Sequence, residues 1–300
     1  MSVPFGVSEG YVPFGEFQTY WRAVGDLHSD KPPLLLLHGG PGSTHNYFEV
    51  LDCLAERTSR AVVGYDQLGC GNSYVEGRPD LWTATTWVDE LANLREALGL
   101  GRVHLLGQSW GGMLAITYLV ERKPEGIRSV VLSSTLSDSQ LWGREQHRMA
   151  RQLPPEEWEA LAEAERTGVF EGAAYERAVD HYMQLHCADL AYGEDAPECL
   201  RRPKRSGREA YVTAWGPNEL TPMGTLAQWS YTDRLAEINV PALVISGTDD
   251  LSTPLIAKTM CDRLPHARWE LMEGCRHMCF VDGHDRYCQI VSDWMAEHDS

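Results

Sequence analysis

Six short runs of apolar residues recur along the chain, and their pattern constrains the fold more than any other feature. Continuous rather than alternating apolarity is typical of strands that are buried on both faces, as in a parallel sheet. Helix-length amphipathic segments, such as residues 86–98, separate several of the runs. This order predicts an α/β fold with a mostly parallel sheet flanked by helices. The runs are "PPLLLLHG" from Pro32, "AVVGYD" from Ala61, "VHLLGQ" from Val103, "SVVLSS" from Ser129, "ALVISG" from Ala242 and "ARWELM" from Ala267.

The alternation of strands and helices stops in one long region, residues 137–231. Helical pieces rich in Trp, Tyr, Arg and Glu replace the apolar runs there, which predicts a helical cap inserted into the core. We therefore expect a core formed by residues 1–136 and 232–300. Ahead of the first long run, "EFQTYWRAVG" from Glu16 alternates enough to predict an antiparallel edge hairpin.

Composition and charge exclude several classes of function. The chain has 300 residues, of which 43% are hydrophobic, so it can bury a sizeable core. Its formal net charge of -17 is unsuited to nucleic acid, and it favours a cationic ligand. The first residues lack a signal-peptide pattern, and no apolar run approaches membrane-spanning length. We expect a soluble cytoplasmic protein without nucleic-acid or membrane partners; its oligomeric state is left open.

The eight cysteines are scattered without CxxC pairs, which argues against a disulfide framework and against a zinc ribbon. We expect most of them to be buried free thiols. Cys275 and Cys279 flank His277 in "CRHMC", but no second group with metal-ligand spacing accompanies them. The sequence therefore predicts no metal site.

The segment "GQSWGG", residues 107–112, places one serine between glycines directly after an apolar run. A G-x-S-x-G segment between a strand and a helix forms a nucleophile elbow, which lifts the serine hydroxyl above the sheet edge. Gly107 and Gly111 are needed because a Cβ atom at either position would collide with neighbouring backbone in the tight turn. We therefore predict Ser109 to be a catalytic nucleophile.

A neutral hydroxyl needs a base and an orienting acid, which in this fold follow the serine in the order acid, then histidine. The turn after "ALVISG" supplies two candidates for the acid, Asp249 and Asp250. The loop after "ARWELM" supplies His277, which we predict to be the base. The remaining C-terminal histidines, namely His266, His284 and His298, are interpreted as surface residues.

An oxyanion hole is predicted from "HGGPG", residues 38–42, which follows the first long apolar run and matches the HGGG-type loop. Gly40 is the expected donor of one backbone N–H group. Trp110, the residue after the nucleophile, is the expected donor of the second.

Together these residues resemble the proline iminopeptidases, which are serine peptidases of the α/β-hydrolase fold. The resemblance extends over nearly the whole chain. It includes "HGGPG", "YDQLGCGNS", "WVDELANLREALGL", "GQSWGGMLA", "WGPNELTPMGTL", "GTDDLSTP" and "EGCRHM". It implies an eight-stranded sheet, a helical cap, and release of one N-terminal residue, proline or alanine, from an amide. It also implies that neither a metal nor an organic cofactor is used.

The resemblance assigns further roles residue by residue. Asp250 matches the orienting carboxylate, with Asp249 as its competitor. Glu219, in "GPNEL", matches the cap glutamate that holds the substrate's free amine. The chain departs from the family at Leu251, where many members carry a second glutamate for that amine. Either Asp249 substitutes for it, or the amine is held by fewer groups in a more apolar pocket.

Aromatic residues of the predicted cap can either line a wide apolar pocket or form the cap's own core, and for most of them we expect the core. They are Trp142, Tyr182, Tyr211, Trp215 and Trp229.

The leading hypothesis is a serine aminopeptidase of proline iminopeptidase type. An alternative substrate setting is removal of an alanyl protecting group from a small-molecule amine, as relatives of this family do for polyketide macrolactam intermediates. A second alternative is an esterase or general amidase that needs no free amine. A third is a ligand-binding receptor without turnover, because a fold does not dictate function.

Overall fold

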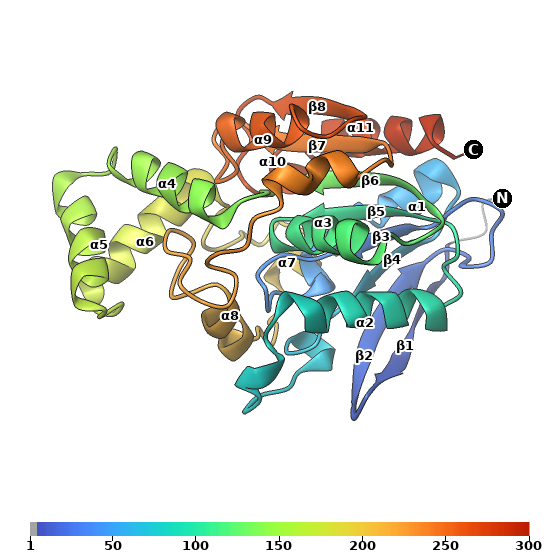
Figure 1. The fold of residues 1–300 in the computed structure, drawn as a ribbon, viewed down its shortest axis with the longest axis horizontal. Coiled ribbons are helices and arrows are strands. Elements are labelled where there is room, and N and C mark those ends of the chain that lie inside the picture. Colours follow the sequence, from blue (N-terminus) through green and yellow to red (C-terminus); the bar gives the residue numbers. More distant parts are fainter. Residues whose placement is uncertain (1–4, 300) are drawn as a thin grey trace.

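The computed structural model describes residues 5–299 and contains an eight-stranded sheet in the order β1-β2-β4-β3-β5-β6-β7-β8 (Figure 1). The first two strands are antiparallel to their neighbours, and β3 to β8 run parallel to one another. The strands are β1 (Val7–Phe14), β2 (Phe17–Val24), β3 (Leu34–Leu37), β4 (Val62–Tyr65), β5 (Val103–Gln108), β6 (Ile127–Ser133), β7 (Ala242–Gly247) and β8 (Ala267–Met272).

Each of the six apolar runs forms one of the parallel strands β3 to β8, which confirms the predicted sheet. Every residue of β3, β5 and β7 is buried, as expected for strands covered on both faces. The last strand, β8, is mostly half-buried, because it lies at the edge and pairs only with β7. The predicted hairpin at Glu16 is a single strand instead: β2 occupies that stretch, and its hairpin partner is β1.

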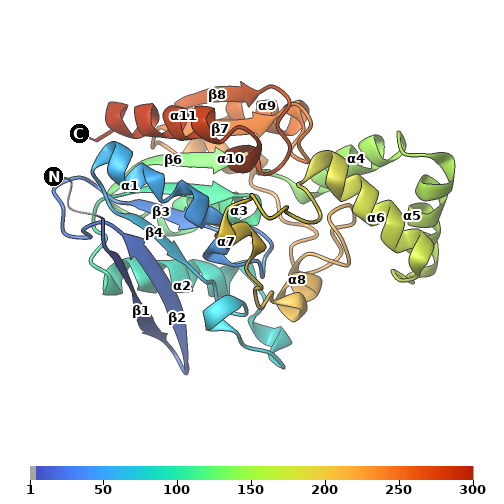
Figure 2. The ribbon, with the colours of Figure 1, turned by 180° about the vertical axis from the view of Figure 1, so that it is seen from behind.

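Helices cover both faces of the sheet. One face is covered by α2 (Ala84–Ala97), α3 (Trp110–Arg122) and α9 (Pro254–Cys261) (Figure 1). Seen from behind, the other face carries α1 (Cys53–Thr58) and α11 (His284–Glu297) (Figure 2). Short helices complete the core, namely η1 (His45–Leu51), η2 (Gly71–Ser73), η3 (Pro79–Leu81), η4 (Thr232–Glu237) and α10 (Cys279–Asp282).

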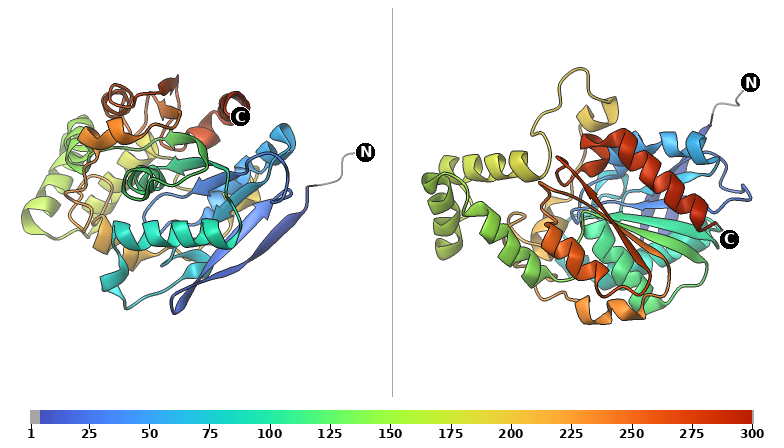
Figure 3. Two further views of the ribbon diagram at one scale, coloured as in Figure 1. Left: turned by 45° about the vertical axis from the view of Figure 1, so that its right-hand side comes forward. Right: turned by 90° about the horizontal axis from the view of Figure 1, so that it is seen from above.

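Five α-helices lie between β6 and β7 in the chain. They are α4 (Ser139–Ala150), α5 (Pro155–Thr167), α6 (Ala173–His186), α7 (Glu198–Arg201) and α8 (Arg208–Ala214). Of these, α4, α5 and α6 project from one side of the sheet (Figures 1 and 3). No helix within residues 5–299 has both the length and the apolarity needed to cross a membrane.

Candidate active site

The turn from β5 into α3 holds Ser109 in a conformation that few residues adopt. Its φ of 55° and ψ of -123° lie outside the helical and extended regions. A Cβ atom on Gly107 would lie 2.2 Å from the Gly111 carbonyl oxygen, and one on Gly111 would lie 1.8 Å from the Leu37 carbonyl oxygen. The two glycines are therefore required for the turn, for the predicted steric reason.

His277 lies in the loop after β8 and contacts the carboxylate of Asp250, which follows β7. The distance from His277 Nδ1 to Asp250 Oδ1 is 2.8 Å, and both side chains are buried. Backbone N–H groups of Gly247 and Ser252 also donate to the Asp250 carboxylate, at 3.2 and 2.8 Å. A carboxylate held in this way fixes the imidazole with its proton on Nδ1, leaving Nε2 as the basic nitrogen.

The two candidate acids have different surroundings. Asp249 is exposed, and its backbone carbonyl oxygen contacts His186 Nδ1 at 2.9 Å. Leu251 is fully buried, and its carbonyl oxygen accepts a hydrogen bond from Gln146 Nε2 at 2.8 Å. Neither Asp249 nor Leu251 lines the cavity that contains Ser109.

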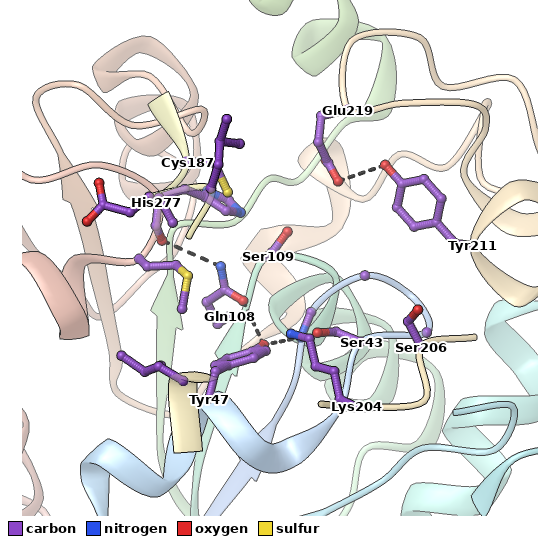
Figure 4. Close-up of a pocket in the computed structure, with 18 of the residues that line it drawn as sticks. Ser43, Tyr47, Gln108, Ser109, Cys187, Lys204, Ser206, Tyr211, Glu219 and His277 are labelled. Carbon is purple, nitrogen blue, oxygen red and sulfur yellow. Dashed lines mark hydrogen bonds between the residues drawn. The ribbon is translucent and has the colours of Figure 1, made fainter. Parts of the chain in front are cut away.

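A cavity of about 770 Å³ brings the predicted residues together beneath the 137–231 segment (Figure 4). Ser109, His277, Gly40 and Glu219 all line it. Three of them follow the carboxyl ends of parallel strands, the edge where α/β proteins bind ligands. Trp110 begins α3, and the free N–H groups at a helix start favour negative charge.

Glu219 is half-buried and faces this cavity. Tyr211 donates a hydrogen bond to Glu219 Oε1 at 2.7 Å, as Figure 4 shows. Burial raises the pKa of Glu219 above its ordinary value, while the Tyr211 hydroxyl and the nearby His277 act in the opposite direction. The indole of Trp142 donates to the Glu219 carbonyl oxygen at 2.8 Å, which fixes the loop. A partly desolvated carboxylate of this kind suits a cationic ligand group.

The aromatic residues singled out in the 137–231 segment divide as expected, because most of them belong to the core. Tyr211 lines the cavity, whereas Trp142, Tyr182, Trp215 and Trp229 are buried among apolar side chains. 

The loop predicted to form the oxyanion hole is held by a hydrogen-bond chain that sequence reasoning missed. Gly39 N–H donates to the Tyr47 hydroxyl at 2.6 Å, and Tyr47 in turn donates to Gln108 Oε1 at 2.9 Å. Gln108 Nε2 contacts the His277 carbonyl oxygen at 3.5 Å. This chain of hydrogen bonds links three segments of the site, and its last contact joins residues that are 169 positions apart in the sequence. No local motif in the sequence marks Tyr47.

Three glycines meet where the 137–231 segment crosses the same loop. Gly207 N–H donates to the Gly42 carbonyl oxygen at 2.7 Å. A Cβ atom on Gly42 would lie 2.5 Å from the Gly207 carbonyl oxygen, and one on Gly207 would lie 2.4 Å from the Gly69 carbonyl oxygen. The backbones therefore approach too closely for side chains at Gly42 and Gly207.

The part of the cavity lined by residues 199–208 carries basic side chains, which the sequence analysis did not single out. Arg201, Lys204 and Arg208 line it. Lys204 Nζ lies 5.7 Å from the centre of the Tyr47 ring, and among the described residues it forms no ion pair with a carboxylate. Desolvation lowers the pKa of Lys204 from its ordinary value.

Residues 5–299 contain two groups of side chains that could hold a metal ion, and neither includes His277. One group is His38, Asp66 and Cys70, whose ring nitrogen and carboxylate already accept hydrogen bonds from backbone N–H groups. The other is Cys53, His284 and Cys288. Its His284 is half-buried and contacts both thiols, so its interpretation as a plain surface residue was wrong.

Comparisons with known proteins agree with the fold and identify the family. The family model of the alpha/beta hydrolase fold matches residues 32–284. A curated proline iminopeptidase from Clostridioides difficile is 53% identical over 293 residues, covering 98% of this chain and 99% of the relative. A proline iminopeptidase from Lactobacillus delbrueckii subsp. bulgaricus is 54% identical over 295 residues, again covering 98% of this chain and 99% of the relative.

Solved structures are also similar over nearly the full length. The crystal structure of VinJ has a TM-score of 0.88 and 34% identity, and covers 97% of this chain and 99% of its own. The crystal structure of a proline iminopeptidase from Mycobacterium smegmatis has a TM-score of 0.85 and 32% identity, with the same coverage. The chain therefore belongs to the proline iminopeptidase family of serine hydrolases, within the α/β-hydrolase fold.

Proposed function

We propose that this protein is a serine aminopeptidase that releases one N-terminal residue, proline or alanine, from an amide. The observation that carries the proposal is one cavity lined by Ser109, His277 and the half-buried Glu219, with His277 paired to the buried Asp250 behind it. A hydrolase without need for a free amine would have no use for a desolvated carboxylate at that place. A receptor without turnover would have no use for a strained nucleophile turn.

In the first half of the reaction, His277 Nε2 takes the proton of the Ser109 hydroxyl as the oxygen attacks the scissile carbonyl. The backbone N–H groups of Gly40 and Trp110 stabilise the oxyanion that develops. Asp250 holds His277 in the required tautomer and stabilises the imidazolium. His277 then gives its proton to the leaving amine, which departs and leaves an acyl-enzyme. Water, activated by His277, hydrolyses this ester and restores the serine.

Glu219 provides the selectivity for a free N-terminus. Its carboxylate, oriented by Tyr211, would bind the substrate ammonium and fix the first residue over Ser109. In this proposal, residues 137–231 act as a cap over the core formed by residues 1–136 and 232–300, and they limit the site to one residue before the scissile bond. The enzyme is proposed to act in the cytoplasm, without nucleic-acid or membrane partners.

Charge in the cavity favours a peptide as the leaving group. Arg201, Lys204 and Arg208 line the cavity together with Glu219. A short peptide has an ammonium at one end and a carboxylate at the other, and so complements both sets of charges. An apolar amine that carries an alanyl group would satisfy only Glu219, and we therefore rank this alternative second.

The test is turnover on a matched panel of prolyl and alanyl amides, each with a free or acetylated amine and with a peptide or a bulky apolar leaving group. We expect preference for free amines on peptides. Ser109→Ala should abolish turnover, and substantial residual activity would refute the assigned nucleophile. Glu219→Gln should impair free-amine substrates but not a simple acetate ester. Equal loss on both substrates would show that Glu219 has only a structural role.

A further inference from the structure

Three metal-ligating side chains meet on the face of the sheet that carries α1 and α11. Cys53 is the first residue of α1, while His284 and Cys288 lie four positions apart at the start of α11 and so share one side of that helix. Cys53 Sγ lies 3.6 Å from Cys288 Sγ and 3.8 Å from His284 Nε2. The third distance, from Cys288 Sγ to His284 Nε2, is 3.7 Å.

The separations between the three ligand atoms are compatible with a tetrahedral zinc site. With Zn–S of about 2.3 Å and Zn–N of about 2.0–2.1 Å, tetrahedral angles place two thiolates about 3.8 Å apart and a thiolate about 3.6 Å from a nitrogen. All three observed separations agree with these values to about 0.2 Å. Cys288 Sγ also lies 3.9 Å from His284 Nδ1, so this thiol lies beside the imidazole ring, and the ring must turn before Nε2 can share an ion with it.

The tautomer of His284 is also the one that a metal requires. His284 Nδ1 lies 3.1 Å from the Phe280 carbonyl oxygen, which can only accept a hydrogen bond. The proton is therefore on Nδ1, and Nε2, the atom near both sulfurs, keeps its lone pair. A backbone carbonyl that orients a ligating histidine in this way is typical of zinc sites.

Charge and access fit a bound divalent cation. Two thiolates carry two negative charges and the imidazole carries none, so the site with bound Zn²⁺ would be neutral. Cys288 is buried, whereas Cys53 and His284 are half-buried, so the group is accessible to an ion from solution. Soft thiolates with one imidazole select zinc over magnesium or calcium.

We propose that Cys53, His284 and Cys288 bind one zinc ion that fastens the C-terminal helix α11 to α1. None of these residues lines the catalytic cavity, so the site is structural and independent of the proposed peptidase chemistry. It connects positions 53 and 288, which lie near opposite ends of the chain. Zinc should therefore stabilise the fold without taking part in turnover.

The experiment uses the full-length protein, reduced and stripped of metal with a chelator. Zn²⁺ is then titrated against a chromogenic chelator, and Co²⁺ is added separately to detect thiolate-to-metal charge transfer. We expect one ion per chain, a raised unfolding temperature, and protection of the half-buried Cys53 from alkylation. Cys261, a half-buried thiol outside the group, should stay unprotected.

Variants separate the site from incidental thiol binding. Cys288→Ser and His284→Gln should each weaken Zn²⁺ binding by at least about 100-fold, beyond the loss typical of changes around the ligands. The matched controls Cys261→Ser and His266→Gln should bind as the wild type does. Because His284→Gln keeps both thiols and lies at a half-exposed position, it tests the site even if Cys288→Ser fails to fold. Zinc binding that is absent in the reduced wild type, or unchanged in His284→Gln, would overturn the proposal, as would a Cys53–Cys288 disulfide in place of metal uptake.

Discussion

Replacing Tyr211 by phenylalanine should move the acid limb of the pH profile for free-amine substrates. The Tyr211 hydroxyl donates to Glu219 at 2.7 Å and lowers the pKa of this carboxyl, which burial raises. A hydrogen bond to a charged group contributes about 1.5–3 kcal/mol, and one pKa unit corresponds to about 1.4 kcal/mol. Because water can enter the cavity and replace part of this bond, we expect the pKa of Glu219 to rise by about one unit.

The sign follows from which form of Glu219 binds the ammonium. Only the ionised carboxylate does so, and a higher pKa leaves less of it at a given pH. In Tyr211→Phe the acid limb of kcat/KM for a prolyl peptide should therefore shift to higher pH by about one unit. The profile for an acetate ester, which has no amine, should stay in place.

The matched control is Tyr192→Phe, which removes another cavity hydroxyl that contacts Met278 rather than Glu219. The assay is initial rates on both substrates across the pH range in which the enzyme is folded. An unmoved acid limb in Tyr211→Phe, or an equal shift for the ester, would refute the argument that Tyr211 tunes the amine-binding carboxylate.

Three further predictions concern stability and the leaving group. Burial lowers the pKa of His38 to about 4, so its contribution to stability is present above its unfolded value and is lost as the pH falls. Lowering the pH from 7 to 5 should therefore reduce the unfolding free energy of the wild type by about 2 kcal/mol. Urea unfolding of His38→Gln should lack this part of the pH dependence. Lys204→Met should raise KM about fivefold for dipeptides with a free carboxylate, equivalent to about 1 kcal/mol, but not for their C-terminal amides; equal effects on both would remove Lys204 from the leaving-group site. Gly111→Ala should cost more than about 2 kcal/mol in unfolding free energy, whereas Gly101→Ala, whose Cβ would meet nothing within 4 Å, should be nearly neutral.

Much of the core could be predicted because its signals are local. A strand buried on both faces, such as β5, leaves a continuous apolar run, and a turn too tight for Cβ atoms leaves glycines at fixed spacing. The first strand was missed for the converse reason. Seven of the eight residues of β1 are exposed or half-buried, because it lies at the sheet edge, and its sequence carries no strong pattern.

Contacts between distant residues could not be predicted in the same way. Cys53 and Cys288 are separated by 235 positions, so their spacing in the sequence does not predict that they are in contact. Tyr211 could be identified as a cap aromatic, but its partnership with Glu219 depends on how α8 and the following loop fold back. Lys204 belongs to a short basic cluster, residues 201–205, that predicts no function from sequence alone. Only the structure shows that Lys204 lines the cavity.

The crossing of Gly42, Gly69 and Gly207 has a consequence for how such enzymes diversify. It fixes the part of the 137–231 segment around Gly207 to the loop of residues 38–42 through a backbone hydrogen bond. Residues 187–206, which supply much of the cavity wall, come directly before Gly207 in the chain. Their side chains can be exchanged by evolution or by an engineer while Gly207 keeps the catalytic loop in register, so substrate range can change without rebuilding the chemistry.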